Sequence, residues 1–232
     1  MQITARGLTK LYGDLPAVHG LDLDVASGEM LALLGRNGAG KSTLLKMLAL
    51  LTKSSGGELM IGDAEERLHP ESLKRRIGML AHNTFLYDDL TASENLHFYC
   101  SIYGIEDAET VCLDALDTVG LRSFSNELVR NFSRGMRQRL TIGRLFLHDP
   151  DLLLLDEPFN GLDDRAVELL EDQLIEAKNR GKTIVLCTHQ IDLALKFASR
   201  LLILHRGKAA YVGENHPGQP VQMQKLYRRY AG

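Results

Sequence analysis

The sequence predicts an α/β fold with a mostly parallel sheet. Short apolar runs, such as MLALLG at 30–35 and LLLL at 152–155, have the continuity of strands buried on both faces. Stretches with apolar residues at helical spacing follow them, and strands that alternate with helices favour a parallel sheet. A glycine-rich segment, GRNGAGKS, joins the first of these runs to its helix. These three observations give the fold class.

Other strands differ from these buried ones in pattern. In LDLDVASGE, the apolar residues Leu21, Leu23 and Val25 alternate with polar ones, which is typical of a half-buried strand that ends in a turn. We expect further strands in GGELMIGD and RRIGMLAH, in KTIVLCTHQ, and in the hairpin RLLILHRGKAAYVGE around Arg206 and Gly207.

A helical region interrupts the alternation between His82 and Asp149. The pattern is helical from 91 to about 130, and Thr91 precedes Glu94 by three residues, as in a capping box. Gly104 and Gly120 are plausible helix ends. We therefore expect one domain over 1–232, with a helical subdomain inserted at approximately 83–149.

Composition limits the classes of function. The 232 residues carry a net charge of −3, with 44% hydrophobic and 25% charged residues. There is no broad basic field of the kind that nucleic-acid binding needs, so we expect no nucleic-acid partner. Cys100, Cys112 and Cys187 are odd in number and far apart, which fits a reducing cytoplasm. The N-terminus has no apolar signal core, and the longest apolar runs are too short to span a membrane.

The segment GRNGAGKS fits the phosphate-loop pattern G-x-x-x-x-G-K-[ST] in full. Its backbone N–H groups can surround phosphate oxygens at the positive end of a helix. Lys41 would reach the β- and γ-phosphates, and Ser42 would bind Mg²⁺. The alternative, a glycine-rich turn with an exposed lysine, does not explain the flanking strand and helix. The predicted nucleotide-binding residues here are Gly35, Arg36, Asn37, Gly38, Ala39, Gly40, Lys41, Ser42 and Thr43.

Two acids follow the strand LLLL, at the sheet edge where ligands bind in open α/β sheets. Asp156 suits the Mg²⁺ shell, directly or through water. Glu157 suits a base that polarises the attacking water. A histidine after a strand is usually structural, but His189 ends another predicted core strand and could lie at the γ-phosphate edge. We therefore predict Lys41, Glu157 and His189 as the catalytic residues.

Together these motifs resemble those of an ABC transporter ATP-binding subunit over nearly the whole chain. GRNGAGKST resembles the family's Walker A motif, and LLLLDEP resembles its Walker B motif. NGLD, which contains Asp163, resembles the D-loop, and CTHQ carries the switch histidine. FSRGMRQR resembles the family's signature sequence. The resemblance implies a P-loop (RecA-like) core, an N-terminal antiparallel β subdomain, the helical insertion, and ATP with Mg²⁺ as cofactors. It also favours Tyr12 as the aromatic that stacks on adenine, although Tyr12 could instead be a strand-end core residue.

The same resemblance implies a second ATP-binding subunit, packed head to tail. The signature of one chain would cap the nucleotide of the other, through Ser133 and the backbone N–H of Gly135 at a helix N-terminus. Arg134 replaces the family's usual glycine, and Met136 replaces its usual glutamine. Neither substitution removes the serine or the second glycine. We expect Arg137 and Arg139 to form a solvated helix face, with salt bridges an additional possibility.

His82 stands where the family usually has a glutamine that senses Mg²⁺ and the membrane partner. We expect it to hydrogen-bond a Mg²⁺-bound or attacking water, because Mg²⁺ prefers oxygen ligands. The segment AHNTFLYDDLTASENLHFY and the phrase DEPF resemble the heme exporter ATPase of cytochrome c maturation. The resemblance thus implies export through integral membrane permease subunits, with this chain cytoplasmic and peripheral on the inner face of the cell membrane.

Alternatives remain. The chain could power another ABC exporter, of lipid, drug or polysaccharide. A soluble ABC ATPase of DNA repair or translation is disfavoured, because the chain has one cassette, no long heptads and no basic extension. A small-molecule kinase would need the phosphate loop but not FSRGM, NGLD and the histidine together.

Overall fold

The structure is a computed structural model that describes residues 1–63, 70–81, 84–216 and 218–231. Its larger sheet has the strand order β5-β6-β7-β3-β8-β9, in which all neighbours are parallel except β8 and β9. The predicted fold class is confirmed. The strands are β3 Met30–Leu34, β5 Ile77–Leu80, β6 Leu152–Asp156, β7 Thr183–Cys187, β8 Arg200–His205 and β9 Lys208–Glu214.

A smaller antiparallel sheet, of order β2-β1-β4, comes from the N-terminal part of the chain. Its strands are β1 Ile3–Tyr12, β2 Leu15–Val25 and β4 Gly56–Ile61. Leu21, Leu23 and Val25 are buried, as their alternation predicts. Helix α1, Lys41–Leu48, packs between the two sheets, where Leu44 and Leu48 share one core cluster with residues of both.

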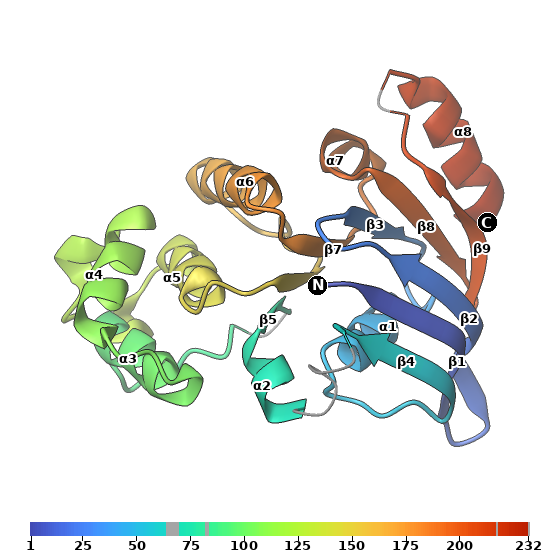
Figure 1. Ribbon diagram of the computed structural model, residues 1–232. Coiled ribbons are helices and arrows are strands. Elements are labelled where there is room, and N and C mark those ends of the chain that lie inside the picture. The colour runs from blue at the N-terminus through green and yellow to red at the C-terminus, as the bar shows by residue number, and fades with distance from the viewer. Residues whose placement is uncertain (64–69, 82–83, 217, 232) are drawn as a thin grey trace.

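Helices cover the other face of the parallel sheet (Figure 1). The helix α6, Asp164–Asn179, packs its leucines on β6 and β7. The helices α7, Ile191–Phe197, and α8, Pro220–Ala231, cover β3 and β8. Because helices lie on both faces, the strands β3, β6 and β7 are almost entirely buried, which explains their continuous apolar runs.

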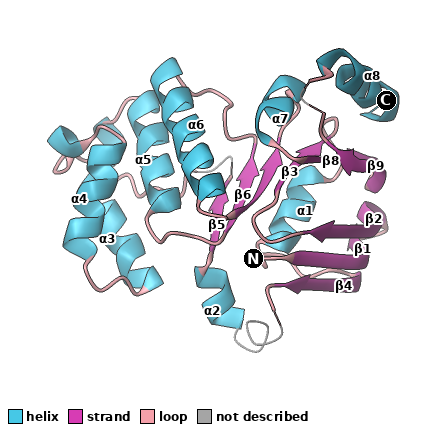
Figure 2. Cartoon of the chain, turned by 45° about the horizontal axis from the view of Figure 1, so that its top comes forward, coloured by secondary structure: helices cyan, strands magenta, loops and turns pink. Residues whose placement is uncertain are grey.

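The helical region lies at one end of the molecule (Figure 2). It contains α3 Ala92–Tyr103, α4 Ala108–Thr118 and α5 Arg134–Phe146. The capping box of Thr91 and Glu94 is present, and Gly104 ends α3 with a φ of 72°. The expected helical pattern up to about 130 is wrong after Gly120, because the chain there forms only two short 3₁₀ turns.

Helix α5 joins the helical region to the parallel sheet. Its Leu140 packs with α3 and α4, whereas Ile142 and Leu145 pack with β6 and α6. The helix therefore belongs to both cores, and a shift of the helical region must act on α5. The division at 83–149 stays a prediction. Helix α2, Pro70–Arg75, leads into β5.

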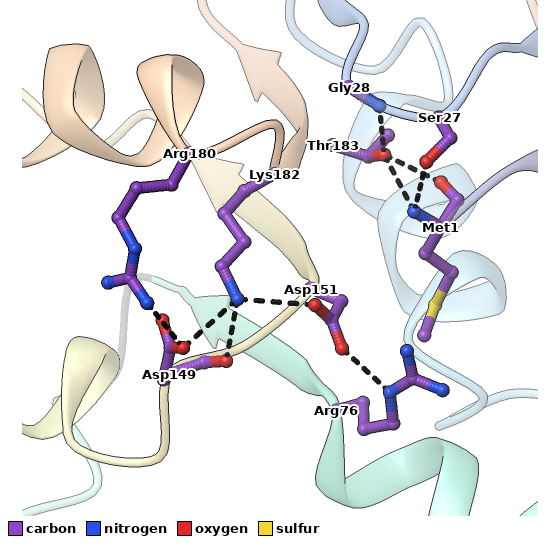
Figure 3. A network of polar contacts seen from close by, with 9 residues as sticks. All are labelled: Met1, Ser27, Gly28, Arg76, Asp149, Asp151, Arg180, Lys182 and Thr183. Carbon is purple, nitrogen blue, oxygen red and sulfur yellow. Dashed lines mark hydrogen bonds and ion pairs between the residues drawn. The ribbon is translucent and has the colours of Figure 1, made fainter.

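Ion pairs hold together the edge of the sheet at which the parallel strands begin (Figure 3). The Lys182 ammonium lies 3.2 Å from both Asp149 Oδ2 and Asp151 Oδ1. Arg180 pairs with Asp149 at 2.6 Å, and Arg76 pairs with Asp151 at 2.7 Å. Burial alone would raise the pKa of Asp151, but hydrogen bonds from Arg76 and Lys182 outweigh it and lower that pKa.

The first residue is bound at the same edge (Figure 3). The Met1 amine donates to Ser27 Oγ at 2.8 Å and to Thr183 Oγ1 at 3.2 Å. The Thr183 hydroxyl donates back to the Met1 carbonyl at 2.6 Å. The start of β7 is thus tied to the start of β1, so the two sheets are connected at this edge.

We predict that Asp151→Asn lowers the free energy of unfolding at pH 7 by about 0.5 to 1 kcal/mol, a small loss because the carboxylate is partly exposed to solvent. Since the pKa of folded Asp151 is lowered, its stabilisation is present above the ordinary carboxyl pKa and is lost as pH falls through the folded value. Urea unfolding at pH 7 and at about pH 3 measures this, the lower pH chosen below the reference carboxyl pKa. Asp172→Asn, on the exposed face of α6, is the control, and equal stability of the two variants at pH 7 would contradict the role of the network.

Candidate nucleotide-binding site

The predicted phosphate loop lies between β3 and α1, where close packing requires glycine at two positions. A Cβ at Gly40 would lie 2.2 Å from the Ala17 carbonyl oxygen, and one at Gly35 would lie 2.5 Å from that of Leu204. Both residues also have positive φ, 104° and 150°. The loop is therefore pressed against β2 on one side and β8 on the other, which fixes its path.

Lys41 lies under this loop and is 7% exposed. Its ammonium donates to the carbonyl oxygens of Gly35, at 2.7 Å, and Arg36, at 3.2 Å. The positive charge is thus held inside the curve of the loop, where the family pattern would place phosphate oxygens. A cavity of about 260 Å³ adjoins it. Its lining residues are Ala17, Asn37, Gly38, Ala39, Gly40, Lys41, Ser42, Thr43, Asp156 and Glu157.

The two predicted acids lie at the carboxyl end of β6 and reach the same cavity. Strand β6 is paired with β7, and Asp156 lies opposite Cys187 in the register. Burial, and then the negative charge of Asp156, raise the pKa of the Cys187 thiol, so this cysteine is neutral. Asp156 and Ser42 face one cavity, and a carboxylate with a hydroxyl oxygen is a donor set that suits Mg²⁺.

Glu157 is held in an unusual backbone conformation beside His189. Its φ is 51°, and its N–H donates to the Cys187 carbonyl at 2.9 Å. Its carboxylate Oε2 lies 2.9 Å from His189 Nδ1, 3.4 Å from the His189 backbone N and 3.5 Å from Asn160 Nδ2. In the tautomer with a proton on Nδ1, His189 donates to Glu157 and orients it.

Asn160 and Gln190 also belong to the site, although they are not among the residues predicted from the sequence. Asn160 contacts Glu157, and Gln190 Nε2 donates to Asn160 Oδ1 at 3.4 Å. The sequence signal for Asn160 is its position three residues after Glu157, which is short enough for one tight turn. In that turn the Asn160 N–H donates to the Glu157 carbonyl at 3.1 Å.

Tyr12 lies at the end of β1, opposite Leu15, and its side chain is 51% exposed. The Lys10 ammonium lies 5.3 Å from the centre of its ring. An exposed ring at a strand end is not a core tyrosine, so the structural alternative is wrong. Stacking on adenine stays a prediction. His82 lies outside the described residues, and its role stays a prediction as well.

The signature segment has the features of an anion-binding site at a helix N-terminus. Ser133 is the N-cap of α5, and its Oγ accepts the Met136 N–H at 3.2 Å. Gly135 follows in the first turn, which contains no acidic residue. Among the described residues, neither Ser133 nor Gly135 lines the cavity beside the phosphate loop of its own chain.

The D-loop contacts the signature segment within one chain. Asp163 is the N-cap of α6, with Oδ1 accepting the Ala166 N–H at 2.8 Å. A Cβ at Gly135 would lie 2.4 Å from Asp163 Oδ2, and one at Gly161 would lie 2.0 Å from the Arg134 guanidinium. Both close atoms belong to side-chain ends that can move, but Gly161 also has a φ of 74°, which favours glycine there. The starts of α5 and α6 are in direct contact.

The expectation of a solvated face is wrong for Arg139. Its Nη1 donates to the carbonyl oxygens of Val119 at 2.9 Å and Gly120 at 3.2 Å, so it binds the C-terminus of α4. Burial lowers the pKa of Arg139. Arg137 has the salt bridge that was expected as a possibility, with Asp88.

Comparisons with known proteins agree with this geometry. The family model described as ABC transporter matches residues 18–160. The ABC transporter ATP-binding protein NatA of Bacillus subtilis is 35% identical over 200 residues, which is 85% of this chain and 81% of that protein. The chain belongs to the ABC transporter family, as an ATP-binding subunit.

Three further similarities support this assignment. The Nod factor export ATP-binding protein I of Cupriavidus metallidurans is 37% identical over 91% of this chain and 70% of that protein. The solved structure of an ATP-binding subunit of an ABC transporter superposes with a TM-score of 0.86, at 30% identity, over 98% of this chain and 95% of that one. A dimeric cassette, MJ0796, bound to ADP and Pi has a TM-score of 0.79 at 27% identity, over 92% and 99%.

As an ABC transporter subunit, the chain binds ATP and is an ATPase whose hydrolysis powers transport. The structure brings Lys41, Asp156, Glu157 and His189 to one edge of the sheet, as the sequence predicts. The individual roles of these residues stay predictions.

We predict that Glu157→Gln keeps ATP binding and lowers steady-state turnover by about 10² to 10⁴-fold, the usual contribution of a general base. The amide retains the shape of the carboxylate but cannot take a proton. Phosphate release and fluorescent-nucleotide binding are measured in parallel. Glu168→Gln, on the exposed face of α6, serves as the control, and turnover near wild type in Glu157→Gln would exclude Glu157 as the base.

Proposed function

We propose that this chain is the ATP-hydrolysing motor of an ABC exporter. The observation that carries the proposal is the contact between Glu157 and His189 beside the phosphate loop. A carboxylate oriented by a histidine at the edge of a phosphate-sized cavity suits the activation of a water molecule.

In this proposal each residue has one task. Lys41 exchanges the Gly35 and Arg36 carbonyls for the β- and γ-phosphates when ATP binds. Glu157 polarises the attacking water, and His189 holds the Glu157 carboxylate in place. Ser42 and Asp156 would hold Mg²⁺, which supplies positive charge that neutralises the phosphates.

We infer that two chains pack head to tail around two ATP molecules. Within the part of the chain that the structure describes, neither Ser133 nor Gly135 lines the cavity beside its own phosphate loop, and we infer that they supply a helix N-terminus to the phosphate loop of the second chain. Two observations support this: the capped, acid-free first turn of α5 and the solved dimers of the related cassette. Because the starts of α5 and α6 touch, the signature and Asp163 would approach the second nucleotide together.

The membrane partner is also a proposal. No helix of the described residues is long and apolar enough to cross a membrane. A transport motor therefore needs integral permease subunits, and we place this chain on the cytoplasmic, inner face of the cell membrane, attached to them. The net charge of −3 supports the absence of a nucleic-acid partner.

The transported substrate is supported less directly. Relatives at 36–38% identity are named for export of Nod factors and fluoroquinolones, and one at 38% is named for bacitracin transport, which supports export as the direction. Heme export rests on the LTASENLHFY and DEPF phrases and on the arginine and methionine of the signature, Arg134 and Met136. Transport assays in inverted vesicles with the cognate permease, comparing heme with amphiphilic drugs, would distinguish these substrates.

The shared site is tested with Ser133→Arg in the Glu157→Gln background. The arginine places bulk at the N-cap where the second chain's γ-phosphate would dock, so we predict that ATP-dependent dimers disappear while ATP binding to the monomer persists. Sedimentation with and without ATP measures this. Ser123→Arg, in an exposed turn of the helical region, adds the same side chain elsewhere and should still form dimers. Undiminished dimers of the Ser133→Arg variant would show that the signature does not cross the interface.

A further inference from the structure

Two of the three cysteines meet in the core of the helical region. Cys100 lies in the last turn of α3, and Cys112 lies in the second turn of α4. Their sulfur atoms are 3.5 Å apart, and both side chains are fully buried. The expectation that the cysteines are far apart is therefore wrong for this pair, because the chain turns after Tyr103 and α4 runs back beside α3 (Figure 2).

The fold itself keeps the two sulfurs in contact. Both helices are capped where they connect, by Gly104 at the end of α3 and by Asp107 at the start of α4. A second contact joins the same helices nearer the surface, where His97 Nε2 lies 3.1 Å from the Glu109 carboxylate. A disulfide needs the sulfurs at about 2.05 Å, and rotation about the Cα–Cβ bonds of the two cysteines supplies a change of this size without moving either helix.

The surroundings of the pair are apolar. Leu96, Leu116 and Leu140 pack in the same core cluster as the two cysteines. Burial raises the pKa of both the Cys100 and the Cys112 thiol, so both are protonated at neutral pH and the reactive thiolate is scarce. The pair is therefore protected from large reagents, and only a small oxidant that enters during local opening of the helices reaches it.

The third cysteine has a different environment. Cys187 lies in β7 and packs in the core between the two sheets. It is buried as fully as the other two, but the chain contains no further cysteine that could pair with it. Cys187 therefore shows what a buried thiol does without a thiol neighbour, and it serves as an internal reference.

We propose that Cys100 and Cys112 are a redox modification site, at which hydrogen peroxide converts the two thiols into a reversible disulfide. In the first step a thiolate sulfur attacks a peroxide oxygen. An S–O bond forms, the O–O bond breaks, and the hydroxide that leaves takes up the thiol proton as water. The sulfur is oxidised to a sulfenic acid, and the peroxide is reduced.

The neighbouring cysteine completes the reaction. Its sulfur attacks the sulfenic sulfur, so the S–S bond forms and the S–O bond breaks. The hydroxide that leaves takes up the second thiol proton as water. Two thiols and one peroxide thus give one disulfide and two waters, and a cellular thiol such as glutathione can reverse the product by exchange. The pair lies outside the nucleotide cavity, so the proposal goes beyond the transport function.

The contact between the sulfurs gives the modification a protective role. A sulfenic acid without a thiol neighbour reacts with a second peroxide and becomes a sulfinic acid, which thiols do not reverse. A charged sulfinate among Leu96, Leu116 and Leu140 would destabilise the helical region, because no partner there compensates the burial of its charge. A thiol held in contact with the sulfenic sulfur reacts first, since the fold supplies a high effective concentration.

Mass spectrometry of the full chain tests the chemistry. The purified protein is treated with hydrogen peroxide, in buffer alone and with urea below its unfolding transition, and is then denatured and alkylated. We expect the number of free thiols to fall from three to one, a peptide that links Cys100 to Cys112, and recovery of all three thiols with dithiothreitol. The reaction should be faster in urea, because opening of the helices admits the oxidant. Absence of this linked peptide in both conditions, or a disulfide that contains Cys187, would overturn the proposal.

Alanine variants test the protection. Cys100→Ala and Cys112→Ala each leave one thiol of the pair, and the double variant leaves neither. After the same treatment and reduction, we expect sulfinic acid at the remaining thiol of each single variant and a melting temperature below that of its own untreated sample. Wild type and the double variant should return to their untreated melting temperatures. Single variants that recover as fully as wild type, or sulfinic acid at the pair in wild type, would refute the protective contact and leave two ordinary core cysteines.

Discussion

The parallel register of β6, β7, β3 and β8 is the constraint on which the site depends. Because neighbouring strands run in the same direction, their carboxyl ends meet at one edge, where the phosphate loop, Asp156 and the contact of Glu157 with His189 come together. At the opposite edge, Lys182 lies between two carboxylates and links the starts of β6 and β7. Gly35 and Gly40 lie so close to neighbouring carbonyl oxygens that the backbone of the phosphate loop is restricted to one conformation.

Elements with strong periodicity could be predicted from the sequence. The runs MLALL and LLLL are buried on both faces, and the hairpin around Arg206 and Gly207 forms as expected. Helices α2 and α8 were not predicted. Helix α2, Pro70–Arg75, is too short to show a helical period in the sequence. In α8 polar residues outnumber the buried ones, so its apolar period is weak. Packing on the sheet, rather than periodicity, therefore decides the structure of both helices.

Site residues on strand ends could be placed from pattern, but contacts between segments could not. Sequence pattern contains no information on the distance between Gly135 and Asp163, between Arg139 and the end of α4, or between the Arg144 guanidinium and the ring of Tyr99. Each depends on how α5 lies between the helical region and the sheet. That shared helix connects the helical region, the signature and the core of the sheet.

The central claim is that one catalytic site is completed by two chains, and complementation tests it most directly. Lys41→Ala removes the phosphate-loop cation but leaves the signature, whereas Ser133→Arg blocks the signature but leaves the loop. Each variant alone should hydrolyse ATP poorly. A mixture forms hybrid pairs with one intact site, so the account predicts ATPase activity well above the sum of the two parents. Activity equal to that sum at every mixing ratio would contradict a site shared between chains.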